Sequence, residues 1–271
     1  MLTHLPFLRA IAREPHDDLP RLVFADFLEE SGETVQVARA HFIRGQIALA
    51  NLDPASPEYL RTEEVVARLK EHFHENWLWD LPEFLRGQRP LHWVRGFIES
   101  AEATLPELVS FGAELFDTCP IIDLRLKSSR VDDSLRPGAF DELPFLLRLT
   151  TLRIGPFYWP FMADGDSEGQ FFDEFMAARA WKNVTTLDLS GNLIDDAWLV
   201  RFVSRLREAI FAKTLKCLDL SHCTRITDAG ATALATARTL ERLQTLKLKE
   251  VPIRRPTRRL LVRRFGEKVE F

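Results

Sequence analysis

Cysteine is scarce in this chain, which limits how the fold can be held together. The 271 residues include only Cys119, Cys217 and Cys223. An odd, sparse count without paired spacing argues against a disulfide framework and favours a reducing compartment. No apolar run reaches the ~18 residues of a transmembrane helix, and residues 1–15 lack the apolar core of a signal peptide. These absences predict a cytoplasmic protein.

Motifs of metal binding and catalysis are missing as well. The histidines of the N-terminal part have neither HExxH nor zinc-finger spacing: His4, His16, His41, His72 and His74. Asp26, Glu29 and Glu30 can lie within one helical turn, but no glycine-rich loop or nucleophile elbow accompanies them. Ion pairs that fix helix packing, such as Arg21 or Arg44 with Asp26, explain them better than a carboxylate site. We therefore expect no enzyme activity, no cofactor and no metal.

Charge is balanced overall but uneven along the chain. The net charge of −4 gives no global attraction to nucleic acid. Residues 1–80 carry 8 lysines and arginines against 14 acidic residues, and residues 249–271 carry 8 against 3. The basic segment PTRRLLVRRFGEKVEF has two interpretations. It could bind a nucleic acid or an anionic membrane. Alternatively, it forms the final repeat helix, with Leu260, Leu261 and Phe265 inward and Val269 and Phe271 in a capping strand, and we favour this interpretation.

Two matching phrases organise the C-terminal part. VTTLDLSGNLIDDAWL begins at Val184, and LKCLDLSHCTRITDAGATAL begins 31 residues later. The alternating leucines predict a short strand with one buried face. Asn192 and Cys223 follow each strand and predict a turn residue that bonds to unpaired backbone. Asp195-Asp196 and Thr227-Asp228 then resemble helix N-caps. Cys223 should turn inward and Cys217 should lie on the open side, so we expect both to be structural.

Four fainter copies of the same frame appear once its phase is fixed. The buried positions of the six frames are Ile98, Ala101, Ala103; Ile121, Leu124, Leu126; Leu149, Leu152, Ile154; Val184, Leu187, Leu189; Leu215, Leu218, Leu220; and Leu243, Leu246, Leu248. First positions are 23, 28, 35, 31 and 28 residues apart, which leaves room for a helix in most units. LPELVSFGAELFD, FFDEFMAARA, AWLVRFVSRLREAI and AGATALATARTL are the predicted helices.

This frame resembles the leucine-rich repeat L-x-x-L-x-L-x-x-N/C. The long units resemble the ribonuclease-inhibitor-like class, and LSHCTRITDAG resembles the cysteine-containing class. The resemblance implies an α/β solenoid, a horseshoe of about six strand–helix units. The first frame departs from the pattern by having alanine where leucine is usual, and the third unit has no asparagine at its turn.

The first 80 residues predict four short helices. Leu5, Leu8, Ile11 and Ala12 share one helical face, and Leu22, Val23, Phe27 and Leu28 form the stripe of the next. A third helix is expected from Val35 to Ala50 and a fourth from Glu63 to Leu78. DDLPRLVFADFLEESGE, ARAHFIRGQIAL and HENWL resemble the bacterial repeat-companion domain. The resemblance implies architecture rather than chemistry, with domains at 1–80 and 81–271.

Strand parity predicts where a partner would bind. Side chains between the frame positions point away from the core, and the charged residues expected to contact a partner are Glu102, Asp123, Arg125, Lys127, Arg153, Asp188, Asp219 and Lys247. This concave face is either a partner surface or a solvated ladder of Glu102–Arg125, Arg153–Asp188 and Asp219–Lys247 pairs. A second candidate is the aromatic loop with Phe157, Tyr158, Trp159 and Phe161, as an interface or a plug. We expect a monomer that binds another protein.

Overall fold

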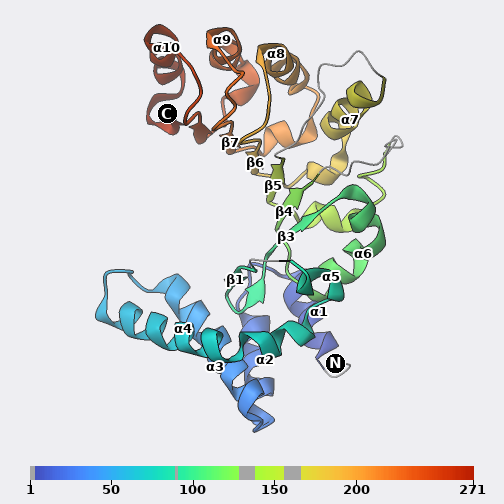
Figure 1. Cartoon of the computed structure of the whole chain (residues 1–271), viewed down its shortest axis with the longest axis vertical. Helices are drawn as coiled ribbons and strands as arrows, with labels where there is room; N and C mark the ends of the chain where they lie inside the picture. The colour runs from blue at the N-terminus through green and yellow to red at the C-terminus, as the bar shows by residue number, and fades with distance from the viewer. Residues whose placement is uncertain (1–3, 89–90, 128–137, 156–165) are drawn as a thin grey trace. The chain divides into compact units, whose positions relative to one another are not determined.

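The computed structural model describes residues 4–88, 91–127, 138–155 and 166–271. They form two compact units, one of residues 1–101 with 110–122 and one of residues 102–109 with 123–271. Strand β3 and helix α6 contribute residues to both units. The element labels are those of Figure 1.

The N-terminal unit consists mainly of helices. They are α1 (Leu5–Arg13), α2 (Leu19–Glu30), α3 (Thr34–Asn51), α4 (Pro57–Trp77), the 3-10 turn η1 (Leu78–Asp80) and α5 (Glu83–Arg86). The four predicted helices are present, but the fourth begins at Pro57 rather than at Glu63. Pro57 stands at the first helical position, where its missing N–H costs nothing. Ser56 caps the helix by accepting a hydrogen bond from the N–H of Tyr59 at 3.1 Å.

Arg39 lies in the core of this unit, surrounded by aromatic rings. Its guanidinium carbon is 4.2 Å from the ring centre of Trp93 and 5.0 Å from that of Trp77. The predicted inward position of Val23 is wrong, because this side chain is 46% exposed. The inward face of α2 is rotated by about one residue, so that Phe24 is buried instead.

A short hairpin follows α5, with strands β1 (Trp93–Val94) and β2 (Phe97–Ile98). Its two turn residues, Arg95 and Gly96, both have positive φ, at 47° and 86°. This left-handed pair matches the twist of a two-residue hairpin. Gln46 of α3 holds the hairpin, accepting from the N–H of Gly96 at 2.7 Å and donating to the carbonyl of Trp93 at 3.1 Å.

One sheet runs through the repeat part of the described chain. Its strands follow one another in chain order: β3 (Ser100–Ala103), β4 (Asp123–Leu126), β5 (Thr151–Ile154), β6 (Thr186–Asp188), β7 (Cys217–Asp219), β8 (Thr245–Lys247) and β9 (Val269–Glu270). The strands from β4 to β9 pair in parallel. Leu124, Leu152, Leu187, Leu218 and Leu246 lie in one register row. The predicted capping strand is present as β9, but it ends at Glu270, so that Phe271 lies beyond it.

Helices and 3-10 turns connect successive strands. They are α6 (Leu105–Thr118), η2 (Pro144–Arg148), α7 (Asp166–Ala177), η3 (Arg179–Trp181), α8 (Asp196–Arg205), η4 (Ile210–Lys213), α9 (Asp228–Thr236), η5 (Arg238–Leu240), α10 (Arg255–Phe265) and η6 (Gly266–Lys268). Helices α8, α9 and α10 lie on the same side of the sheet (Figure 1). All eighteen predicted frame positions are at most 3% exposed. The frame therefore identified both the strands and their buried face.

The predicted caps are confirmed. Asp195 accepts a hydrogen bond from the N–H of Trp198 at 2.9 Å, and Thr227 accepts one from the N–H of Ala229 at 3.4 Å. Helix α8 ends at Arg205, earlier than the sequence run to Ile210 suggested, and a turn leads into η4.

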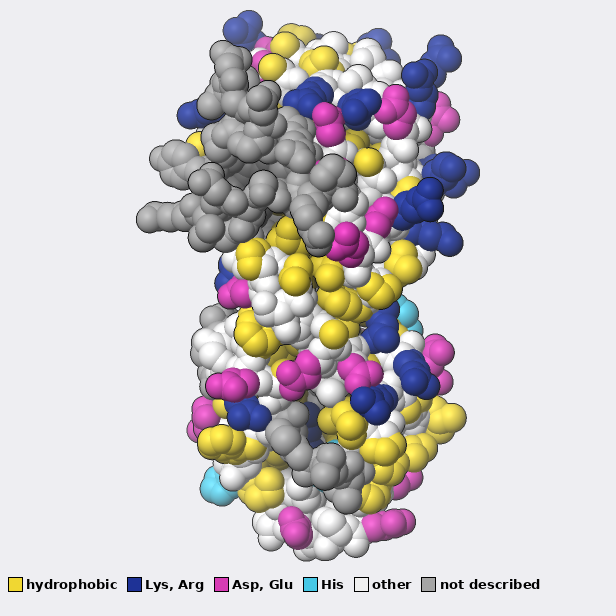
Figure 2. Space-filling model, turned by 90° about the vertical axis from the view of Figure 1, so that its right-hand side faces the viewer, with side chains coloured by type: hydrophobic (Ala, Val, Ile, Leu, Met, Phe, Trp, Pro, Cys, Tyr) yellow, Lys and Arg dark blue, Asp and Glu magenta, His cyan; other side chains and the backbone are white. Residues whose placement is uncertain are grey.

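The surface is mixed in charge. On the face drawn in Figure 2, basic side chains lie among acidic ones. Within the described ranges, the helices are too short or too polar to cross a bilayer.

Candidate binding surface on the open face of the sheet

The sheet has an open face, formed by side chains that alternate with the buried leucines. Its central row is Arg125, Arg153, Asp188, Asp219 and Lys247, which are register partners from one strand to the next. All five are half-buried. The predicted parity is therefore correct, and the row reads basic, basic, acidic, acidic, basic.

The two arginines that begin the row form ion pairs within the chain. Arg125 Nε lies 3.2 Å from Glu102 Oε1, as predicted, and Lys127 Nζ lies 3.9 Å from Glu102 Oε2. The predicted Arg153–Asp188 pair is wrong. Arg153 instead reaches Asp123 with two hydrogen bonds, from Nε at 3.0 Å and from Nη2 at 2.6 Å.

The fork of Arg153 explains this choice of partner. Asp123 is one strand away and diagonal to it, so both of its oxygens can meet the two guanidinium donors. Burial raises the pKa of the Asp123 carboxyl, and Arg153 offsets that increase only in part. The pair is therefore a partly buried clamp between β4 and β5.

The acidic centre of the row is less well compensated. Asp188 lies directly opposite Asp219 across β6 and β7. Each carboxylate accepts the backbone N–H two residues on, from Ser190 and from Ser221, both at 2.9 Å. Lys247 Nζ is 4.0 Å from Asp219. Within the described part of the chain Asp188 forms no direct ion pair, although its charge, after that of Asp123, helps to raise the pKa of its register neighbour Arg153. Like charges directly opposite on a sheet repel each other.

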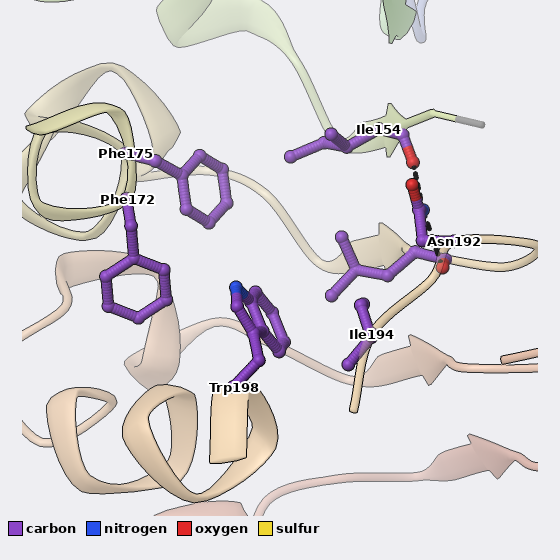
Figure 3. A pocket seen from close by; sticks show the side chains of 7 residues that line it. Ile154, Phe172, Phe175, Asn192, Ile194 and Trp198 are labelled. Atoms are coloured by element: carbon purple, nitrogen blue, oxygen red, sulfur yellow. Dashed lines mark hydrogen bonds between the residues drawn. The ribbon is translucent and has the colours of Figure 1, made fainter. Parts of the chain in front are cut away.

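The turn residues beyond the strands stabilise the repeats rather than form a reactive site. Asn192 is 2% exposed and donates to the carbonyls of Ile154 and Leu189, each at 2.7 Å (Figure 3). Cys223 is fully buried, and its Sγ donates to the Leu189 carbonyl at 3.3 Å. Cys217 is half-buried on the open face. All three placements agree with the sequence prediction.

The acidic residues of α2 form ion pairs with α3. Arg44 Nη2 lies 2.6 Å from Asp26 and 2.7 Å from Glu29, and Glu29 also meets His41 at 3.3 Å. The hydrogen bond from Arg44 lowers the pKa of Glu29. Among the described residues, no group of three or more histidines, cysteines or acids could hold a metal ion. The predicted Arg44–Asp26 pair is confirmed, whereas Arg21 bonds elsewhere.

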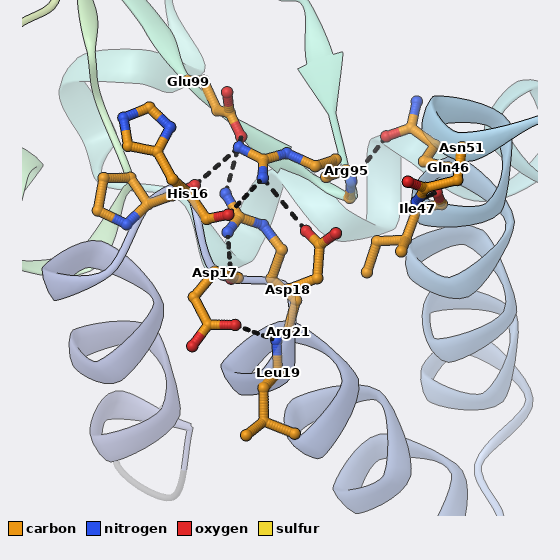
Figure 4. Close-up of polar contacts among 12 residues, drawn as sticks. His16, Asp17, Asp18, Leu19, Arg21, Gln46, Ile47, Asn51, Arg95 and Glu99 are labelled. Carbon is orange, nitrogen blue, oxygen red and sulfur yellow. Dashed lines mark hydrogen bonds and ion pairs between the residues drawn. The ribbon is translucent and has the colours of Figure 1, made fainter.

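A buried charge network near the hairpin was not predicted (Figure 4). Arg21 is fully buried and its Nη2 lies 2.7 Å from Glu99 Oε1, the same oxygen that Arg95 meets at 2.8 Å. Arg95 also contacts Asp18 at 3.2 Å and the carbonyl of Pro15 at 2.7 Å. Burial and the charge of Arg95 lower the pKa of Arg21, while Glu99 and Asp18 oppose that change. The one sequence signal for this region was the dipeptide Arg95-Gly96 between two apolar pairs, which is typical of a hairpin turn. It could have located the hairpin, but not the partners of Arg95.

Two cavities in the described residues are too small for a ligand. One of about 10 Å³ is lined by Ile154, Phe172, Phe175, Leu189, Asn192, Ile194 and Trp198. One of about 20 Å³ is lined in the N-terminal unit by residues that include His4, Arg39 and Cys119. Each has room for about one water molecule. The aromatic loop candidates Phe157, Tyr158, Trp159 and Phe161 lie outside the described residues.

Comparison with known proteins adds one finding. Residues 212–235 match the Leucine Rich repeat family. The matched span holds β7 and nearly all of α9, which is one strand–turn–helix unit. The match supports a leucine-rich-repeat protein, and such a repeat suggests a protein-interaction module, generally a non-catalytic one. No curated protein and no solved structure matches the chain significantly.

Proposed function

We propose that this chain is a non-catalytic module that binds another protein on the open face of its sheet. The leucine-rich-repeat match supports this proposal, because stacked repeats present extended binding surfaces. In finer detail, we propose a repeat-companion domain at 1–80 and a solenoid of the ribonuclease-inhibitor-like, cysteine-containing class at 81–271. The proposal places the chain in the cytoplasm as a monomer without cofactor.

The observation that carries the proposal is the juxtaposition of Asp188 and Asp219. Each carboxylate stabilises its own turn by accepting the N–H of Ser190 or Ser221, but the repulsion between the two opposed charges works against folding. A lysine or arginine from a partner, placed between them, would relieve that repulsion. Their half-buried position would strengthen the attraction relative to a fully solvated pair. We therefore propose that the partner presents a basic side chain at this point.

Electrostatic attraction should dominate the affinity. The open face of the described strands carries charged side chains, threonines, Ser100 and Cys217, and no aromatic anchor of the kind that dominates tight interfaces. Arg125 and Arg153 are already engaged with Glu102 and Asp123. Binding should accordingly weaken as salt is raised.

The test is an affinity pull-down from the native host, compared with the double variant Asp188→Asn and Asp219→Asn. Asparagine keeps the oxygen that accepts from Ser190 and Ser221, so the turns should survive while the charge is lost. We expect the identified partner to bind the variant at least about tenfold more weakly, and the variant to be no less stable.

A matched control removes two acids away from the open face, by Glu208→Gln and Glu267→Gln. This control should retain the partner. Equal binding by the Asp188/Asp219 variant and the parent chain would contradict the open-face site. Reversal of Arg125 and Arg153 to glutamate breaks two intramolecular pairs and adds negative charge beside Asp188, so it is the less specific test.

A further inference from the structure

Three arginines form a row on the last helix. Arg255, Arg259 and Arg263 are spaced by four residues on α10 and therefore share one helical face. All three are exposed. Within the described ranges, none of them makes an ion pair with an acidic residue. Helix α10 itself contains no acidic residue.

The neighbouring arginines behave differently, because each has a role within the fold. Arg254 Nε lies 3.3 Å from Asp228, and Arg264 Nη2 lies 3.8 Å from Glu241. The guanidinium of Arg258 lies 4.9 Å from the ring centre of Phe271. The arginines of this basic segment therefore fall into two groups. Arg254, Arg258 and Arg264 contact other parts of the fold, whereas the three arginines of the row on α10 form no ion pairs with the described acidic residues.

Folding alone does not account for the row. Leu261 and Phe265 are the buried residues of α10 and explain its packing. Like charges four residues apart repel each other, and Arg255 stands in the first turn, where the helix dipole disfavours a cation. The surroundings add to this positive charge, since residues 213–271 hold 14 lysines and arginines against 6 acids, a net charge of +8.

We propose that this row binds the phosphate backbone of a nucleic acid. The guanidinium fork matches phosphate oxygens, and six of the eight cations in residues 249–271 are arginines. The exposed large hydrophobic residue of α10 is Val262, whose side chain is 48% exposed. This apolar surface is too small for insertion into a membrane or for an interface anchor. Binding to a nucleic acid requires neither membrane insertion nor an apolar anchor, because the release of counterions from this dense polyanion supplies the affinity. The surface is separate from the open face, so this proposal does not depend on the proposed function.

The test compares the full chain with the triple variant Arg255→Gln, Arg259→Gln and Arg263→Gln. Binding to a labelled double-stranded DNA, and to RNA of the same sequence, is followed by fluorescence anisotropy between about 50 and 200 mM salt. We expect the variant to bind at least about tenfold more weakly at the lowest salt. The slope of log affinity against log salt should become shallower by about 2 to 3, because three phosphate contacts are lost.

A matched control removes three exposed cations outside α10, by Arg179→Gln, Lys182→Gln and Arg207→Gln. Circular dichroism and thermal melts establish that both triple variants are folded. The control should keep the parental salt slope, whereas equal loss in both variants would show general charge attraction and overturn the site. Absence of DNA and RNA binding by the parent chain at low salt would also overturn it, as would binding to phosphatidylserine vesicles alone.

Discussion

The side-chain amide of Asn192 donates a 2.7 Å hydrogen bond to the backbone carbonyl of Ile154, in the repeat before its own. The same nitrogen donates to the carbonyl of Leu189 at 2.7 Å. In the next repeat, Cys223 takes the equivalent place and donates to Leu189 at 3.3 Å. In these two repeats, one turn residue thus satisfies carbonyls that the strands leave unpaired.

Replacement of Asn192 should therefore destabilise the repeat unit in a graded way. Asn192→Ala leaves two buried carbonyls without this donor, and we expect a loss of about 2–4 kcal/mol in the free energy of unfolding. Asn192→Cys should cost less, because a thiol can donate weakly to one carbonyl, as Cys223 does. Urea unfolding of the full chain measures both values. Equal destabilisation by alanine and cysteine would contradict the hydrogen-bonding role.

Gly155 should prove coupled to Asn192. Its φ is +111°, and a Cβ added there would overlap the Asn192 amide. We expect Gly155→Ala to cost more than about 2 kcal/mol in the parent chain, from backbone strain of about 1 kcal/mol plus the overlap. In the Asn192→Ala background only the strain remains, so the double-mutant cycle should show a coupling of about 1 kcal/mol or more. Additive effects would show that the two residues do not meet.

Glu99 should be among the most sensitive positions of the N-terminal unit. Glu99→Ala leaves the fully buried Arg21 without its carboxylate, which should cost about 3–5 kcal/mol in unfolding free energy. The matched control is Arg44→Ala, which breaks the more exposed pairs with Asp26 and Glu29 and should cost about 1 kcal/mol or less. Denaturant titrations of both variants rank the two sites. A small effect at Glu99 would contradict the role of the network.

The repeat architecture could be predicted because its signal is periodic. Leucines at fixed intervals specify a buried strand face wherever they recur, so even the frame of Ile98, Ala101 and Ala103 was placed correctly. The turns show where the pattern becomes weaker. Gly191, His222 and Glu250 all have positive φ at the second residue after their frames. Only the first is a glycine, so sequence alone could not identify the shared conformation.

Ion pairs were harder to predict, because strand parity indicates the face of the sheet on which a side chain lies but not which charged group it contacts. Arg153 was paired with its register neighbour Asp188, yet its bidentate fork fits the diagonal Asp123. The Arg21–Glu99 pair joins residues 78 positions apart, and no local pattern links them. The same limitation applies to the binding surface. The side chains of the open face were predicted, whereas the incomplete compensation of the opposed Asp188 and Asp219 charges emerged from the arrangement of the ion pairs.

Asp228 should give the repeat unit a stability that depends on pH. The N–H of Arg254 donates to it at 2.9 Å, and this hydrogen bond is the main reason that the pKa of Asp228 is lowered. A carboxylate with a lowered folded pKa stabilises the fold above its unfolded pKa, and loses that contribution as pH falls through the folded value. The stability difference between the parent chain and Asp228→Asn should therefore shrink below about pH 5. Thermal melts across acid pH measure it, and a difference that grows on acidification would contradict the assignment.

The three cysteines should report the opening of each unit separately. Burial raises the pKa of Cys119 and of Cys223 to about 12 each, while Cys217 is only half-buried. At pH 8 iodoacetamide should therefore modify Cys217 first, and the other two only when their surroundings open. Cys119 belongs to the N-terminal unit and Cys223 to the repeat unit. Glu99→Ala should accelerate the modification of Cys119 alone, and Asn192→Ala that of Cys223 alone, as measured by mass spectrometry of each cysteine peptide. Equal acceleration at both sites in either variant would show that the two units open together.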